Sequence, residues 1–446
     1  MKRFIETLRN IWRIEDLRKR ILTTLGLILI YRLGSHVVLP GVDPNMLAGL
    51  EEQTSKGVLG LLDMFSGGAF SRASVFGLGI MPYISASIVV QLLGIAVPYF
   101  QKLQREGESG RKRINQITRY LTVGILLLQA PSYIANLHTQ LPPEAFAIRG
   151  TLFTISSVII LTAGTMFVMW LGERITDKGI GNGISLIIMI GIIARLPLSF
   201  AQEVVSRFSA QAGGLIMLLV ELVILFVIFM LTIALVQAVR RIPVQYAKRV
   251  VGNRQYGGVR QYIPLKVNAA GVMPIIFAQA LMFVPIMISG FSDSDTMSNF
   301  GAAFADYTGF WYNLVFAIMI ILFTYFYTAV TVNPQQMAED MKKNGGFIPG
   351  VKPGKKTVEF MDNIMSRITL PGSIFLAIVA ILPAFATLAG VNNQFAQFFG
   401  GTSLLILVGV VLDTLQQIES HLLMRHYDGL TKSGRIKGRG QTASAL

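Results

Sequence analysis

Residues 61–98, LLDMFSGGAFSRASVFGLGIMPYISASIVVQLLGIAVP, determine how the rest of the chain is interpreted. A short apolar run breaks at Gly67 and Gly68, and a second apolar run extends over residues 74–97. Because a helix needs about 20 apolar residues to cross a bilayer, only the second run is long enough. We expect the first run to enter the membrane and turn back, which irregular backbone tolerates only when protein covers it or a wet cavity surrounds it. The stretch therefore predicts a cavity inside a membrane protein, occupied by a small movable segment.

The composition is that of a polytopic membrane protein. Of the 446 residues, 52% are hydrophobic and only 14% are charged, and the mean hydropathy is +0.57. The apolar runs alternate with short polar segments, which indicates one membrane domain. The chain has no cysteine, which excludes disulfides, thiolate metal sites and cysteine nucleophiles. Residues 1–20 are basic and amphipathic without a cleavage site, which predicts a cytosolic helix on the membrane surface.

Hydropathy predicts ten membrane spans. They lie at roughly 21–39, 74–97, 120–137, 151–172, 183–200, 214–239, 269–290, 311–332, 369–387 and 402–424. The segments on the N-terminal side of the membrane, including the basic tail 425–446, hold 33 of the 39 Lys and Arg residues. Cytoplasmic segments carry the excess of Lys and Arg, so both termini are predicted to be cytoplasmic.

Ten spans divide into an N-terminal half, residues 21–200, and a C-terminal half, residues 201–424. An odd number of spans in each half makes the second half enter from the opposite face, as in an inverted repeat. The predicted fold is an all-α polytopic membrane protein with ten transmembrane helices in two inverted, pseudo-symmetric halves of five. A re-entrant segment lies at about 61–72, and the functional site is expected between the halves.

Two long cytoplasmic segments, 240–268 and 333–368, are basic and punctuated by glycine and proline. Both are predicted to form protruding, hairpin-like loops. A solvated cytoplasmic face is the ordinary explanation for any single lysine there. Two long basic loops exceed what topology requires, and they suit an acidic partner such as RNA phosphate or a carboxylate-rich protein.

The sequence offers no pattern of an enzyme, and we predict no catalytic residue, cofactor or metal. The four histidines form no HExxH motif, and Lys355 lacks the upstream glycine spacing of a phosphate-binding loop. Asp413 is the one carboxylate expected deep within a span, either as a functional charge or as a group satisfied by neighbouring glutamines. Glu221 and Arg32 are expected near span ends, where long side chains reach towards water.

Uncharged polar residues and isoleucines mark two further patterns within the spans. Gln91, Gln129 and Gln279 are expected to face one another or water, or to serve as ordinary hydrogen-bonding groups between helices. The pairs Ile80/Ile84 and Ile184/Ile188 have four-residue spacing, so each pair shares one helix face. Packing and lipid contact are common alternatives for such pairs.

Several longer motifs carry a family resemblance. MFSGGAFSRASVFGLGIMPYISASIVVQLL, REGESGRKRINQITRY, GTMFVMWLGERITDKGIGNGISLII, PLKVNAAGVMP and FGGTSLLILVGVVLD resemble the SecY family of protein-conducting channels. The resemblance extends from about Arg18 to the last span. It implies a ten-span clamshell of two halves around an hourglass pore, located in the bacterial cytoplasmic (inner) membrane.

The resemblance also implies roles for individual residues. The apolar pore ring maps to Ile80, Ile84, Ile184, Ile188, Ile276 and Ile406. The plug maps to residues 61–72 with Phe65, Ser66, Gly67, Gly68 and Arg72. The lateral gate, through which signal sequences are recognised, maps to Ile88, Gln91, Gln129 and Gln279.

Partners are implied in the same way. Family members form a heterotrimer with SecE and SecG and are driven by the SecA ATPase or by the translating ribosome, through its RNA and proteins. The corresponding contacts map to Arg249, Arg254, Arg260, Lys342, Lys343, Lys352, Lys355 and Lys356. Signal sequences, nascent polypeptides, membrane lipid and accessories of the SecDF and YidC type complete the expected set. Lys352 stands where the family usually has arginine, so it keeps the charge but loses the planar fork.

Two alternative functions have weaker support in the sequence. A secondary solute transporter would share inverted halves and a broken span but would need a charged or discretely polar substrate site. Only Asp413 is available for that purpose. An intramembrane protease would need a carboxylate dyad or zinc ligands, and neither is present in the sequence.

Overall fold

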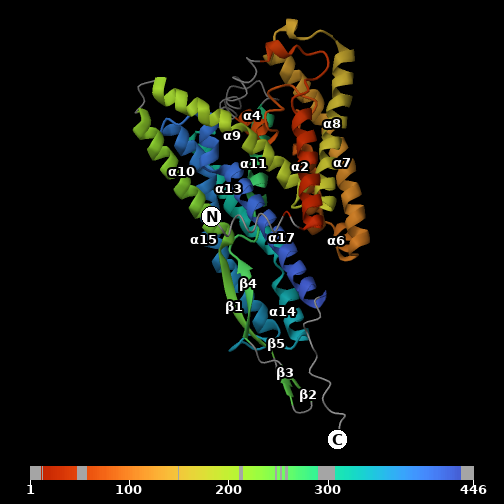
Figure 1. Ribbon diagram of the computed structural model, residues 1–446, viewed down its shortest axis with the longest axis vertical. Coiled ribbons are helices and arrows are strands. Elements are labelled where there is room, and N and C mark those ends of the chain that lie inside the picture. The colour runs from red at the N-terminus through yellow and green to blue at the C-terminus, as the bar shows by residue number, and fades with distance from the viewer. Residues whose placement is uncertain are drawn as a thin grey trace.

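The computed structural model describes residues 12, 14–47, 58–148, 150–209, 214–246, 249–251, 254–256, 260–289 and 307–432. Each of the ten predicted spans overlaps one helix in the bundle shown in Figure 1. These helices are α2 (Glu15–Gly34), α5 (Met81–Ala96), α7 (Glu108–Gln140), α8 (Thr151–Lys178), α9 (Gly183–Ser209), α10 (Gly214–Gln237), α11 (Met273–Ser289), α13 (Phe310–Thr331), α15 (Lys355–Leu388) and α17 (Gly401–Lys432).

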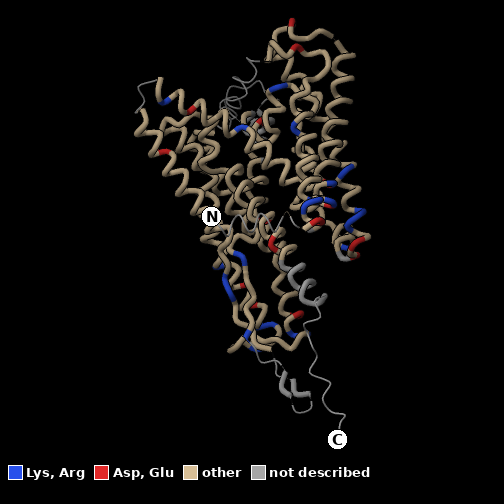
Figure 2. Tube along the Cα trace, viewed as in Figure 1, with Lys and Arg blue, Asp and Glu red and all other residues tan. Residues whose placement is uncertain are grey.

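Seven helices in the described ranges are long and apolar enough to cross a membrane, and a bent pair raises this to eight. The bent pair contains α5, which has 16 residues by itself, and α11 has 17. Both lengths are at or below the lower limit for a perpendicular span. The chain is thus a multi-pass membrane protein, and the count of ten spans stays a prediction. In Figure 2, most Lys and Arg lie on the projecting lower part and around the lower ends of the helices on the right, while the upper part of the bundle carries fewer.

The second span is shorter than predicted. Residues 74–80 form turns, and α5 begins only at Met81 with Pro82 in its first turn. Gly79 has a φ of +56°, a conformation that a helix does not use. The helix then bends by 100° into α6 (Pro98–Arg105). The expectation of one continuous helix over 74–97 was therefore wrong. Gly79 has a non-helical backbone conformation, and Pro82 suits the first turn of a helix and not its interior.

The predicted re-entrant segment is a short helix followed by turns. Helix α4 (Val58–Phe65) ends just before Gly67 and Gly68, which have φ values of +67° and +88°. In Figure 1, α4 lies inside the bundle, beside α9 and α2. We call α4 and the turns up to Ala73 the plug segment.

The first long basic loop is a β-hairpin, as predicted. Strand β1 (Val239–Tyr246) pairs with β4 (Arg260–Lys266) in antiparallel register, and β5 (Gly346–Phe347) adds to the other edge of β1. The short strands β2 (Arg249–Val251) and β3 (Arg254–Tyr256) pair at its tip. The hairpin projects from the helical bundle in Figure 1.

The second basic loop is not a hairpin. It consists of α14 (Pro334–Lys343), strand β5, a turn, and then the beginning of α15. Asn333 caps α14 by accepting from the backbone N–H groups of Gln335 and Gln336. Helix α15 has 34 residues, so at 1.5 Å per residue it is about 50 Å long. Because a bilayer core is about 30 Å thick, its first turns extend beyond the membrane beside the hairpin.

Short elements close the opposite end of the bundle. They are the 3-10 helices η1 (Pro44–Met46) and η2 (Pro143–Ala145), helix α16 (Asn393–Ala396), and the 3-10 helix η3 (Gln397–Phe399). Phe146 and Phe153 pack there with their ring centroids 5.4 Å apart. Together with Phe70 from the plug segment they belong to a buried apolar cluster. The plug segment is therefore anchored in the core of the N-terminal half.

Candidate functional site: plug, apolar constriction and seam

The plug segment is organised around the buried side chain of Asp63. Its Oδ1 accepts a 2.7 Å hydrogen bond from the backbone N–H of Ser71, eight residues later. The hydroxyl of Ser66 donates to the carbonyl of Asp63 at 3.0 Å and accepts from the N–H of Phe70 at 3.0 Å. Because carboxylate and hydroxyl groups satisfy buried backbone donors, the turns hold a defined shape inside the bundle.

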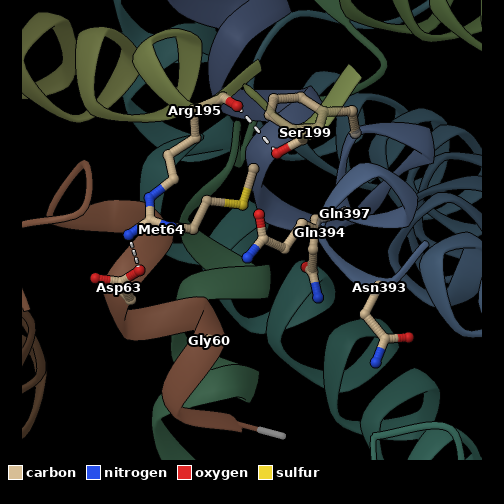
Figure 3. Close-up of a pocket in the computed structure, with 9 residues that line it drawn as sticks. Gly60, Asp63, Met64, Arg195, Ser199, Asn393, Gln394 and Gln397 are labelled. Atoms are coloured by element: carbon tan, nitrogen blue, oxygen red, sulfur yellow. Dashed lines mark hydrogen bonds and ion pairs between the residues drawn. The ribbon is translucent and has the colours of Figure 1, made fainter. Parts of the chain in front are cut away.

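Arg195 of α9 connects the plug segment to the wall of the bundle. Its guanidinium makes an ion pair with Asp63 and donates to the hydroxyl of Ser71 at 2.8 Å. All three residues are buried. Figure 3 shows the guanidinium reaching down from α9 to the carboxylate on α4. The sequence placed Arg195 only among the cations outside the cytoplasmic segments, so this contact was not foreseen.

Helix α2 contacts the same turn from another side. The hydroxyl of Tyr31 donates to the carbonyl of Ser66 at 3.2 Å, and Nη1 of Arg32 donates to the carbonyl of Gly67 at 3.1 Å. Arg32 was expected near a span end, and it lies in the last turn of α2. Its side chain was expected to reach towards water, but it is half-buried and donates to the glycine turn.

The distal end of the plug segment is fixed to α7 and to the end of α2. The hydroxyl of Tyr133 donates to the carbonyl of Phe70 at 2.8 Å, and the two rings lie 4.7 Å apart. Arg72, a predicted plug residue, lies 2.9 Å from Nδ1 of His36. Since arginine can only donate, that histidine nitrogen accepts. Residues from α2, α7 and α9 thus hold the plug segment.

The six predicted ring isoleucines lie in two adjoining apolar clusters. Ile80, Ile188 and Ile406 are buried in the main cluster, with Ile84 and Ile184 packed against it. Phe65 of the plug segment belongs to the same cluster. Ile276 packs instead against a smaller cluster, to which Ile84 also belongs. Five of the six isoleucines thus lie in or against the cluster that contains Phe65 of the plug segment, and the role of the six as a pore ring stays a prediction.

The smaller cluster forms a seam between α5 and the helices α11 and α13. Ile88, Phe277 and Tyr327 are buried in it, and the rings of Phe277 and Tyr327 lie 5.1 Å apart. The hydroxyl of Tyr327 donates to Oε1 of Gln91 at 2.6 Å. One polar contact thus crosses an otherwise apolar seam at the predicted lateral gate.

The other two glutamines do not meet Gln91. Oε1 of the buried Gln279 accepts from the hydroxyl of Thr402 on α17 at 3.1 Å. Gln129 is exposed on α7. Of the alternatives given for the three glutamines, contact with one another was wrong, whereas Gln91 and Gln279 do form hydrogen bonds between helices. Helical spacing cannot foresee this arrangement, because it does not determine how helices are rotated against each other.

A second buried charge cluster lies where α9 and α10 meet. Arg207 donates to Oε1 of Glu203 at 2.8 Å, pairs with Glu221, and donates to the carbonyl of Gly390 at 2.8 Å. Oε2 of Glu203 accepts from the N–H of Asn392 at 2.8 Å. Glu221 was expected near a span end, but it is only 3% exposed. The four-residue spacing of Glu203 and Arg207 was a sequence signal for this cluster that our prediction missed.

The side chain of Asp413 is exposed and forms no hydrogen bond with another described residue. Gln417 instead accepts from the N–H of Gly181 at 2.9 Å. The alternative in which neighbouring glutamines satisfy Asp413 was therefore wrong. The described residues also contain no group of three His, Asp or Glu side chains placed to hold a metal ion.

The predicted partner contacts lie on the projecting end of the molecule. Arg260, Lys342, Lys343, Lys352, Lys355 and Lys356 are exposed. Arg249 and Arg254 lie on β2 and β3, and their side chains are outside the described part of the structure. Lys352 lies between Gly350 and Gly354, whose φ values are +84° and +104°. Its carbonyl accepts from the hydroxyl of Thr357 at 3.0 Å, so a fixed turn presents the lysine side chain.

Comparison with known proteins places this geometry in a family. The SecY family model matches residues 74–415. The chain is 43% identical over 433 residues to the "Protein translocase subunit SecY" of Streptomyces scabiei, covering 94% of this chain and 98% of the relative. It is 42% identical over 452 residues to the protein of the same name from Mycobacterium bovis, covering 96% and 99%.

Solved structures show the same fold at lower identity. "The structure of a protein conducting channel" matches with a TM-score of 0.55 and 17% identity over 94% of this chain and 95% of that one. A second, titled "The plug domain of the SecY protein stablizes the closed state of the translocation channel and maintains a membrane seal", matches with a TM-score of 0.59, 16% identity and the same coverage. On these matches and on the plug, constriction and seam described above, the chain belongs to the SecY family.

Proposed function

We propose that this chain is the protein-conducting channel of a bacterial Sec translocase, which carries unfolded secretory polypeptides across the cytoplasmic membrane. It also releases membrane helices sideways into lipid. The observation that carries the proposal is the plug segment, which packs against the apolar constriction beside a seam closed by few polar contacts. In the second solved structure above, the plug is described as stabilising the closed state, and we assign residues 61–72 the same role here.

The apolar constriction suits a pore for polypeptides. Aliphatic side chains contact a passing polypeptide without binding its charged residues tightly. A narrow apolar ring also limits ion passage by steric fit and dewetting. We assign this function to Ile80, Ile84, Ile184, Ile188, Ile276 and Ile406. The energy for movement comes from partner proteins.

The seam provides the lateral exit. When α5 separates from α11 and α13, a segment in the pore meets lipid, where apolar residues are favoured and a central charged residue costs about 2.5–3.5 kcal/mol. Ile88 and Gln91 lie on one side of this seam, and Tyr327 lies on the other. We propose that signal sequences are recognised there.

The projecting basic end is the proposed docking site for the SecA ATPase and the translating ribosome. Its lysines are exposed and held on a hairpin, a helix and a fixed turn. One solved relative of this fold is described as Sec61 in a ribosome-channel complex. SecE and SecG are the proposed partners of the membrane part, with SecDF- and YidC-type proteins as accessories.

Both termini are proposed to be cytoplasmic. In Figure 1, α2 begins and α17 ends on the side of the bundle from which the hairpin projects. Single cysteines introduced at Gly345 and Glu144 of this cysteine-free chain test the orientation in intact cells. We expect an impermeant maleimide to label Glu144→Cys and to spare Gly345→Cys, and the reverse pattern contradicts the topology.

Reconstitution tests the function. The chain, purified with SecE and SecG, is placed in vesicles and supplied with SecA, ATP and an unfolded precursor carrying a signal sequence. We expect the precursor to become protected from external protease only when ATP is present. Unaided uptake of a small solute, without precursor protection, would instead support the transporter alternative.

A further inference from the structure

We propose that the ion pair between Asp63 and Arg195 is a charge latch that keeps the plug segment seated and sets how readily the channel opens. The inference rests on the proposed function of the plug, and it assigns this task to two particular side chains. Neither residue belongs to the apolar constriction or to the seam.

The ion pair connects the hydrogen bonds inside the plug segment to helix α9 in the wall of the bundle. One oxygen of Asp63 accepts from the N–H of Ser71, and the carboxylate also pairs with Arg195. Arg195 in turn donates to the hydroxyl of Ser71 at 2.8 Å. The three residues form a closed ring of contacts, so Arg195 contacts both ends of the glycine turn.

Backbone packing holds the turn at the required distance from α9. A Cβ atom on Gly68 would lie 2.9 Å from Nη2 of Arg195, and one on Gly67 would lie 2.8 Å from the Cα of Gly191. Both plug glycines have positive φ values. The glycine turn therefore packs directly against α9, and the guanidinium of Arg195 contacts the carboxylate of Asp63 directly.

A small cavity lies beside the latch. It has a volume of about 30 Å³, and its lining combines the apolar Met64 and Phe398 with polar side chains that include Asp63, Arg195 and Gln394 (Figure 3). Oε1 of Gln394 is buried without a hydrogen-bond partner. A cavity of this size has room for one or two water molecules. Once the plug segment moves, both charges can be hydrated through this cavity.

These surroundings make the latch a two-state contact. A buried ion pair contributes little net stability compared with two hydrated charges, but removing one partner leaves the other charge buried without compensation, which is strongly unfavourable. The closed state keeps the pair intact, and the open state hydrates both groups. A partial displacement that separates the charges before both are hydrated is disfavoured, so the plug segment is either seated or fully released.

A double-mutant cycle tests the latch. The variants Asp63→Asn, Arg195→Gln and the combination are purified with SecE and SecG, reconstituted in vesicles, and assayed for ion leak without precursor. We expect each single change to raise the leak about tenfold, the change produced in an equilibrium constant by about 1.4 kcal/mol. The double variant should return towards the wild-type leak, because no buried charge is left unpaired. Additive single effects, or singles equal to wild type, overturn the proposal.

Matched controls separate this test from failure of the proposed function. Arg119→Gln breaks another arginine–carboxylate pair, with Glu173, away from the plug segment, and should leave the leak unchanged. Deletion of residues 62–72 should raise the leak; if it does not, the plug role itself is wrong. Arg195→Lys keeps the buried charge but loses the fork, so it should fold like the wild type and give an intermediate leak. A wild-type leak in both Asp63→Asn and Arg195→Gln, together with a leaky deletion, contradicts the latch alone.

Discussion

The hydroxyl of Tyr327 on α13 donates a 2.6 Å hydrogen bond to Oε1 of Gln91 on α5, 236 residues earlier in the chain. The contact crosses the apolar seam in which Ile88 and Phe277 are buried. A hydrogen bond between neutral groups contributes about 1 kcal/mol, and it is costly to leave one buried partner unpaired. This pair therefore closes the seam without making it difficult to open.

Removing that hydroxyl should make the seam easier to open. Tyr327→Phe leaves the amide oxygen of Gln91 without its partner, and a loss of about 1 kcal/mol changes an opening equilibrium roughly fivefold. We expect greater export of a reporter whose signal sequence has been shortened in its apolar core. Tyr325→Phe, on the same helix, is the matched control, because Tyr325 is half-buried and its hydroxyl contacts the carbonyl of Ser366 on α15 at 3.5 Å instead of α5. Equal export in the two variants would remove the Tyr327–Gln91 contact from gating.

Hydrating the constriction should weaken the closed state. Ile406 is 4% exposed, and Ile406→Asn places an amide there that lacks a partner, at a cost of about 1–3 kcal/mol. We expect a larger ion leak and export of precursors with defective signal sequences, and the same direction for Ile276→Asn. Ile406→Leu keeps the volume and should stay close to wild type. Unchanged leak and export in both asparagine variants would show that these isoleucines do not form the ring.

Lys352 should act through its charge. The flanking turn presents one exposed side chain, and attraction between exposed charges weakens with salt. Lys352→Glu is expected to reduce SecA-driven import into vesicles severely, whereas Lys352→Arg should be near neutral. Lys112→Glu, an exposed change at the start of α7, controls for net charge. A large gain with Lys352→Arg would mean that the partner requires the planar fork.

The cluster around Arg207 should matter for stability. Arg207→Ala leaves the carboxylates of Glu203 and Glu221 buried together, and breaking a buried pair in this way costs about 3–5 kcal/mol. We expect a clear drop in the thermal unfolding midpoint of the purified protein in detergent. Arg119→Ala removes a more exposed partner of Glu173 and should cost no more than about 1 kcal/mol. Similar midpoints for the two variants would mean that the cluster is not a stabilising unit.

Much of the fold was predictable because the membrane constrains sequence strongly. Long apolar runs located all ten helices, and the break at Gly67 and Gly68 located the plug segment. The hydropathy pattern did not predict where α5 begins. The residues before Met81 were expected to be helical, but the backbone there is irregular, with a positive φ at Gly79. Hydropathy measures the environment of a residue and not its backbone conformation.

The buried charges were the largest omission. Asp63 and Arg195 are 132 residues apart, and nothing local to either residue identifies its partner. Gln279 bonds to Thr402 rather than to Gln91 for a related reason: its partner depends on how α11 is rotated in the bundle. Spacing can say which residues share a face of one helix, but which faces meet depends on the packing of the whole molecule.

The attachment of the plug segment has a consequence for the order of events in the channel. The polar contacts described above for this segment come from α2, α7 and α9, all in the N-terminal half, whereas the seam parts α5 from α11 and α13. Parting the seam does not itself break the contacts made by Tyr31, Tyr133 and Arg195. In the proposed function, an apolar segment can therefore enter the lipid through the seam while the plug segment still blocks the route across the membrane, so membrane insertion and secretion would differ in whether the plug must leave.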